Sequence, residues 1–211
     1  MQLLDPVEAR VLGALMEKEA TTPEYYPLSL NALVNACNQK SNRDPVVDYD
    51  DDTVEDAVHR LRQKQFSFLV TGNGRVNKYR QRISETLNLG RRESAALCTL
   101  LLRGPQTLGE IKDRGERMYN FADLAEIEMV LDKLADWPGG ALVKKLPRQP
   151  GQKEARVAHL LCGEPDFEAV AETAGAPPLG KVAQLEAELQ ELRAEFSELK
   201  ARLNALEAQW K

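Results

Sequence analysis

The segment DTVEDAVHRLRQKQFSFLVTGNGRVNKYR, residues 52–80, decides the fold. Its first part predicts a helix that begins at Asp52, where Glu55 completes a capping box. Its second part contains two β-prone runs around Asn73-Gly74, a dipeptide that favours a hairpin because both residues tolerate positive φ. A helix followed directly by a hairpin is the second part of a winged helix-turn-helix domain. Apolar residues mark the buried face of the helix: Val54, Val58 and Leu61.

The residues before this segment predict the rest of that domain. Asp5-Pro6-Val7-Glu8 combines a capping Asp, a proline at the first helical position and a Glu three residues after the cap. A second helix is predicted from Ser29, because apolar residues follow it at helical spacing. The order helix, helix, helix, hairpin predicts a winged-helix domain at residues 1–88.

The same order recurs over residues 89–164, which predicts a second winged-helix domain. The fold class is therefore mainly α with small β-hairpin wings (α+β), arising from an internal duplication. A single mixed α+β domain is the alternative. The predicted elements of the second half are a helix from Arg91 to Arg103, a capping box from Thr107 to Glu110, a helix from Asp123 to Trp137 with a box formed by Asp123 and Glu126, and the strands ALVKKL and ARVAHLL.

Three segments resemble one family. They are ARVLGALMEKEATTPEYYPLSLNALVNACNQKSNRDPV, TLLLRGPQTLGEIKDRGERMYNFADLAEIEMVLDKLA and PGQKEARVAHLL. These segments look like the YceH family of uncharacterised bacterial proteins, and the resemblance covers most of residues 4–164. It implies tandem winged-helix domains in a bacterial cytosolic protein, and it implies no reaction.

The last part of the chain predicts self-association. Residues 165–180 are rich in Pro, Ala and Gly and predict a linker before a coiled-coil helix at residues 181–211. Charges at the flanking e and g positions are attractive in a parallel dimer and repulsive in a centred antiparallel one, so we predict a parallel homodimer. A trimer and a heteromeric partner remain alternatives. The predicted dimer interface consists of Val182, Leu185, Leu189, Leu192, Phe196, Leu199, Leu203, Leu206 and Trp210.

Catalytic and metal-binding patterns are not found in the sequence. The two histidines, His59 and His159, have no neighbour at metal-ligand spacing, and no phosphate-binding loop or nucleophile motif is present. We therefore predict a protein that is not an enzyme and that needs no cofactor and no metal. Cys37, Cys98 and Cys162 are read as reduced thiols, and no apolar run approaches the ~18 residues of a membrane span, which predicts a cytoplasmic protein.

In each half, the predicted third helix is rich in acids and the predicted wing is rich in cations. Residues 48–56 contain six acids and no cation, although this is where a recognition helix would start. Residues 57–84 contain seven cations and no acid, and the second wing at 143–160 contains five cations against one acid. We predict nucleic-acid contacts at turns and wings, through Asn38, Gln39, Lys40, Asn42, Arg43, Arg75, Lys78, Arg80, Lys144, Lys145, Arg148 and Lys153.

Two functions fit this pattern. The first is a DNA-binding, transcription-regulator-like dimer that contacts double-stranded DNA through its wings. The second is an assembly scaffold that uses its winged-helix domains to dock an unidentified protein, since the net charge is −5 and the third helices are acidic. Basic wings that serve only as solvated strand edges are the plainer alternative.

Overall fold

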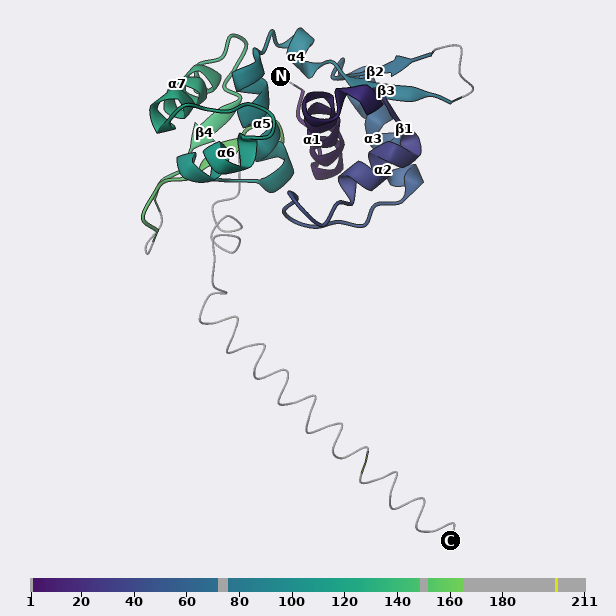
Figure 1. Cartoon of the computed structure of the whole chain (residues 1–211), viewed down its shortest axis with the longest axis horizontal. Coiled ribbons are helices and arrows are strands. Elements are labelled where there is room, and N and C mark those ends of the chain that lie inside the picture. The colour runs from purple at the N-terminus through teal and green to yellow at the C-terminus, as the bar shows by residue number, and fades with distance from the viewer. Residues whose placement is uncertain (1, 72–75, 149–151, 165–199, 201–211) are drawn as a thin grey trace. The chain divides into compact units, whose positions relative to one another are not determined.

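The structure, a computed structural model, describes residues 2–71, 76–148, 152–164 and Lys200 (Figure 1). Residues 2–164 of this set contain seven α-helices and two small antiparallel sheets, a mixed α+β arrangement. By their internal contacts, residues 1–165 form one unit and residues 166–211 another. The predicted linker and the predicted seam from Val182 to Trp210 lie outside the described residues. No helix among the described residues is long and apolar enough to cross a bilayer.

Helix α1 (Pro6–Thr21) begins as the sequence predicts. The backbone N–H of Glu8 donates to Asp5 Oδ1 at 2.8 Å, and the backbone N–H of Asp5 donates to Glu8 Oε2 at 2.7 Å. A short 3₁₀ turn (Pro23–Tyr25) follows, and then α2 (Leu30–Cys37), which begins one residue after the predicted start, with Ser29 as its cap. The reciprocal bonds between Asp5 and Glu8 satisfy backbone N–H groups that would otherwise lack partners at the start of α1.

Helix α3 (Asp51–Gln63) starts earlier than predicted. The capping residue is Asp50, whose side chain accepts from the backbone N–H of Thr53 at 2.9 Å. The prediction of a start at Asp52 with a box completed by Glu55 is therefore wrong. Several consecutive acids can cap a helix, and the sequence alone does not distinguish among them.

The strands of the first half form a sheet in the order β1-β3-β2. Strand β1 (Leu28–Ser29) was not predicted, whereas β2 (Ser67–Val70) and β3 (Lys78–Gln81) are the two predicted strands of the hairpin. Their antiparallel register pairs Ser67 with Gln81, and the predicted turn at Asn73-Gly74 lies outside the described residues. A short helix, α4 (Ile83–Thr86), leads into the second half.

The second half repeats this order with α5 (Arg91–Arg103), α6 (Leu108–Gly115), α7 (Leu124–Ala135), β4 (Val143–Lys145) and β5 (Val157–His159). The predicted box of Thr107 and Glu110 is present at the start of α6. Asp123 caps α7 as predicted, but the box with Glu126 is incomplete. The Glu126 carboxylate accepts instead from the backbone N–H of Ala122 at 2.8 Å.

The two halves match in register as well as in order. Leu28 pairs with Tyr79 just before α2, and Gln106 pairs with Val157 just before α6. A buried glutamate on the first helix also binds a cation on the third helix in each half. Glu8 lies 3.5 Å from Arg60, and Glu93 lies 2.6 Å from Lys133.

Helix α1 lies between α5 on one side and α2 and α3 on the other (Figure 1). The α1–α5 packing is close at Gly13, where an added Cβ would lie 2.8 Å from Leu102 Cδ2. The thiol of Cys98 donates to the Gly13 carbonyl oxygen at 3.3 Å. One buried apolar cluster therefore runs through both halves.

Candidate nucleic-acid interface

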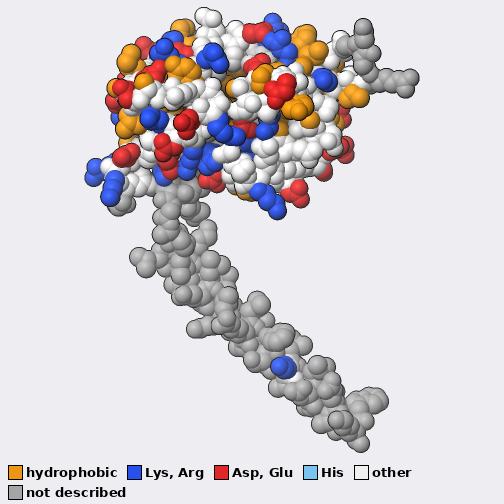
Figure 2. Space-filling view, in the orientation of Figure 1, with side chains coloured by type: hydrophobic (Ala, Val, Ile, Leu, Met, Phe, Trp, Pro, Cys, Tyr) orange, Lys and Arg blue, Asp and Glu red, His pale blue; other side chains and the backbone are white. Residues whose placement is uncertain are grey.

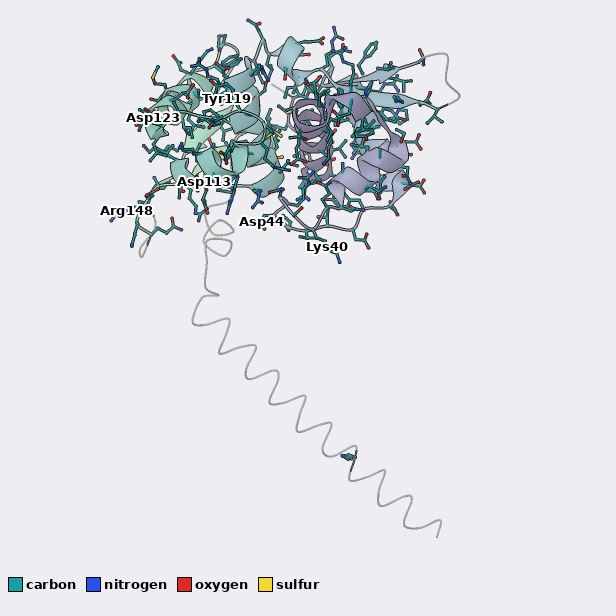
Figure 3. The ribbon with its side chains drawn as sticks, viewed as in Figure 1. Lys40, Asp44, Asp113, Tyr119, Asp123 and Arg148 are labelled. Atoms are coloured by element: carbon teal, nitrogen blue, oxygen red, sulfur yellow. The ribbon has the colours of Figure 1, made fainter. Side chains whose placement is uncertain are left out.

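Most predicted contact residues of the loop between α2 and α3 form hydrogen bonds within the loop or to the neighbouring helices α1 and α5. The side chain of Asn38 donates to the Tyr49 carbonyl at 2.8 Å and accepts from the Tyr49 N–H at 2.9 Å. Asn42 has a positive φ of 58° and accepts from Arg103 at 2.9 Å. Gln39 Oε1 accepts from Lys18 Nζ at 3.3 Å. Of the predicted residues on this loop, Lys40 is the exposed cation, and it lies at the loop's outer edge (Figure 3).

Arg43 is not a surface residue, which contradicts its predicted role. Its guanidinium is buried and forms two bonds to the Glu17 carboxylate, at 3.2 Å to Oε1 and 2.7 Å to Oε2. It also donates to the Ala36 carbonyl at 2.7 Å. Arg117, from the turn before α7, binds the same Glu17 at 2.7 Å. The turn cations of both halves therefore meet at one buried carboxylate.

This cluster keeps Glu17 ionised. Burial opposes ionisation of its carboxyl, but the hydrogen bond and charge of Arg43 and the charges of Lys18 and Arg117 outweigh burial and lower its pKa. A buried carboxylate between two guanidiniums has its lone pairs satisfied inside the protein. Glu17 and Arg43 therefore form a buried structural ion pair, and the half-exposed Arg117 closes it toward the solvent.

The first hairpin presents its cations on one face. Phe68 pairs with Arg80 and Val70 pairs with Lys78, so these four side chains share a side of the two-stranded ribbon. Phe68 is 50% exposed and Lys78 is exposed, whereas Arg80 donates to Glu85. Arg75 lies outside the described residues. The described part of the hairpin therefore combines an aromatic ring with accessible positive charge, and it extends away from the helices (Figure 1).

In the second hairpin, two of the predicted contact lysines form ion pairs. Lys144 lies 2.6 Å from Glu164 and Lys145 lies 3.7 Å from Glu128. Arg148 and Lys153 are exposed on the loop between β4 and β5, and Arg148 lies on the part that projects from the body (Figure 3). Of the predicted contacts in this half, the two loop cations are the more accessible to a ligand.

The third helices present acids and some apolar side chains. Asp51, Asp52 and Asp56 are exposed on α3. On α7, Leu124 is 48% exposed and Met129 is 71% exposed. On the face shown in Figure 2, positive and negative side chains are interspersed and no single basic surface forms.

A groove beside the first hairpin was missed by the sequence reasoning. It has a volume of about 610 Å³ and lies between the end of α3 and β2, with His59, Arg62, Phe68 and Arg82 among its lining residues. The run of cations in 57–84 was the available signal. The exposure of Phe68 was not predictable, because most aromatic residues on β-prone runs are buried. Within the described part of the chain, no group of three or more His, Cys, Asp or Glu is placed to hold a metal ion.

Two similar three-helix halves, each with a small hairpin, define a mixed α+β protein with basic hairpins and acidic third helices. The chain belongs to the family described as "Protein of unknown function, DUF480", which matches residues 4–152. It is 56% identical over 194 residues to a UPF0502 protein of Solibacter usitatus, covering 89% of this chain and 92% of the relative. A UPF0502 protein of Geobacter sulfurreducens is 54% identical over 186 residues, covering 88% and 84%. A third, from Vibrio vulnificus, is 49% identical over 199 residues, covering 89% and 90%. These names assign no reaction.

Proposed function

We propose that each half, residues 1–88 and 89–164, is a winged helix-turn-helix domain. The matched helix order, the Ser29 and Thr107 caps and the matched strand register support this assignment. The linker at 165–180 then leads to a parallel coiled coil at 181–211 that pairs two chains, a proposal carried by the heptad spacing of the sequence. We also propose that the YceH resemblance and the UPF0502 relatives describe one family.

The function that the site supports best is non-enzymatic binding of double-stranded DNA by a regulator-like dimer in the cytoplasm. The carrying observation is the contrast within the first half between an exposed cationic hairpin and an acidic start of α3. Phosphates attract the hairpin and repel the helix start, so the wing rather than the third helix approaches the backbone. The free thiols of all three cysteines support a reducing compartment.

The set of proposed contacts is narrower than the sequence alone suggests. Arg43 is excluded by burial, and Asn38 is occupied by the backbone of its own loop. Lys144 and Lys145 are held in exposed ion pairs, each worth about 0–1 kcal/mol, so phosphates can displace their acidic partners at small cost. The proposed contacts are Lys40, Arg75, Lys78, Arg148 and Lys153, with the ion-paired Arg80, Lys144 and Lys145 secondary.

Fluorescence anisotropy with a mixed-sequence 30-base-pair duplex tests this function at low and moderate salt. We expect binding at low salt that weakens steeply as salt rises, because each bound phosphate releases counterions. Replacement of Arg75, Lys78 and Arg80 by Ala together should weaken binding and reduce the salt slope by about one for each phosphate-binding cation removed. If that triple variant binds as the parent does, the wing is not the contact surface.

A second candidate function, docking of a protein partner, is favoured by α7. Leu124 and Met129 are exposed on this helix, next to the exposed acids Glu128 and Asp132. At 100° per residue the two acids project between the two apolar side chains, so this exposed face suits a partner helix with basic groups flanked by apolar ones. Met129→Glu should abolish capture of such a partner and leave duplex binding unchanged. Capture that survives this substitution would remove α7 from consideration.

A further inference from the structure

The groove between α3 and β2 has an aromatic wall and a basic rim. Phe68 is 50% exposed there, whereas the preceding residue of β2, Ser67, is buried. His59, Arg62 and Arg82 contribute the basic groups, and no Asp or Glu is among the described residues that line the groove. The chain has a net charge of −5, so the positive charge of this groove comes from the local arrangement of side chains and not from the overall composition.

Its cations are only lightly engaged by the protein. Arg62 Nη1 lies 3.5 Å from His59 Nδ1, and within the described part of the chain Arg62 forms no ion pair with a carboxylate. Arg82 donates to Gln65 Oε1 at 3.0 Å and lies 3.9 Å from Glu85, whose side chain is 57% exposed. Both guanidiniums are therefore available to an anion at the mouth of the groove.

We propose that this groove binds one unpaired nucleotide of a nucleic-acid strand, with its base stacked on Phe68 and its phosphates at Arg62 and Arg82. This inference rests on the proposed nucleic-acid function and names the partner of one part of the site. Stacking on an aromatic ring accepts every base, and guanidiniums hold the phosphates that flank it. A base within a duplex has both faces covered by its neighbours, so the occupant is single-stranded or unpaired.

Two oligomers with equal charge separate stacking from phosphate binding. The first is a fluorescein-labelled dT 12-mer, and the second is an abasic oligomer with the same number of phosphates, each titrated against full-length protein. We expect the dT oligomer to bind between about 5-fold and 150-fold more tightly, the range that corresponds to loss of one stacked base. Phe68→Leu should remove that difference, whereas Phe68→Trp should retain it.

Phe68→Leu keeps an apolar side chain at a half-exposed position, so the fold is expected to survive, and a thermal melt followed by circular dichroism verifies it. Phe68→Trp adds a direct readout, because a base stacked on the new indole quenches its fluorescence and the abasic oligomer does not. Arg62→Gln and Arg82→Gln together should weaken binding of both oligomers to a similar degree.

Equal affinity for the two oligomers, or a dT affinity unchanged by Phe68→Leu, overturns the stacking site. Tight binding of the 30-base-pair duplex with no binding of the dT oligomer also overturns it and leaves the proposed function standing. If neither the duplex nor the dT oligomer binds at low salt, both the site and the proposed function fail. Quenching of Phe68→Trp by the dT oligomer alone is the result expected if the inference is right.

Discussion

The two halves of the molecule share an order of helices and strands, but they differ in which charged side chains they bury. In the first half, the connection between α2 and α3 spans residues 38–50, and in the second the connection between α6 and α7 spans residues 116–123. In the first half, buried guanidiniums donate to carbonyl groups at the end of α2 and within the longer connection, and such groups need donors when they are buried. Arg10 donates to the carbonyls of Cys37 at 3.2 Å and Pro45 at 2.6 Å, and Arg43 donates to that of Ala36.

The first helices of the two halves differ at the positions where α1 carries buried charge. When Glu8 is aligned with Glu93, the buried Arg10 and Glu17 of α1 correspond to Ala95 and Leu102 of α5, which are also buried. The half with the short connection therefore keeps an apolar helix face. Among the described residues, the buried arginines Arg10 and Arg43 lie in the half with the longer connection, whereas both halves bury a glutamate on the first helix. Buried charge in this fold does not by itself mark a functional site.

The largest expected effect comes from breaking the buried ion cluster of the first half. Glu17→Gln leaves Arg43 buried without its counter-charge, which should reduce the free energy of unfolding by about 3–5 kcal/mol. Glu93→Gln is the matched change in the second half, and its partner Lys133 has a 59% exposed side chain. That change should cost no more than about 1 kcal/mol. Urea unfolding measures both, and equal losses would refute the distinction.

The two histidines differ in their exposure to solvent. Burial lowers the pKa of His159 to about 4, while His59 is exposed on α3. Between pH 6.5 and 4 the unfolded chain binds a proton that the folded chain does not, so the free energy of unfolding falls as the pH falls. The slope contributed by His159 is up to about 1.4 kcal/mol per pH unit.

His159→Gln should flatten that slope across the window. Urea unfolding at several pH values between 4 and 7 measures it. A parent slope that His159→Gln does not change would show that the imidazole is solvated in the folded protein.

The close packing between the halves predicts opposite signs for two glycine substitutions. An added Cβ at Gly13 would lie 2.8 Å from Leu102 Cδ2 and 3.2 Å from Leu101 Cβ, so Gly13→Ala should destabilise by about 1–3 kcal/mol. At Gly109 the nearest atom is 4.0 Å away, so Gly109→Ala should stabilise α6 by up to about 1 kcal/mol. Thermal unfolding gives both signs. A stabilising Gly13→Ala would mean that α1 and α5 are not packed as described.

The smallest effects concern the second hairpin. Replacing the exposed Arg148 and Lys153 by Ala should reduce the salt slope of duplex binding by about one per cation. Replacing the paired Lys144 and Lys145 by Ala should change it less, because Glu164 and Glu128 already offset their charge. Anisotropy at four salt concentrations compares the two double variants. A larger loss from the paired lysines would reverse the assignment within this hairpin.

Local sequence signals predicted the elements well. The caps at Asp5, Thr107 and Asp123 are confirmed, because each places an oxygen next to free amides at the start of a helix. The α5 bounds at Arg91 and Arg103 are also confirmed, since Gly104 takes a positive φ of 68° at its end. Strand β1 was missed because two residues paired with a distant strand leave no periodic pattern.

The candidate site was harder to predict than the fold. A charged residue in a polar run is predicted to be exposed. Only the tertiary contacts show that Arg43 is buried against Glu17. The exposure of Phe68 and the ion pairs of Lys144 and Lys145 also depend on residues far away in the chain. Sequence reasoning located the basic segments but not which of their side chains remain accessible.

Photo-crosslinking tests most directly whether the hairpin, rather than the third helix, contacts DNA. The photoreactive residue p-benzoylphenylalanine replaces Val76, which is 62% exposed beside the hairpin strands, or Asp56, which is exposed on α3. Each variant is irradiated with the 30-base-pair duplex at low salt. We predict a protein–DNA crosslink from position 76 and none from position 56. A crosslink from position 56, or from neither position, would contradict the proposed role of the hairpin.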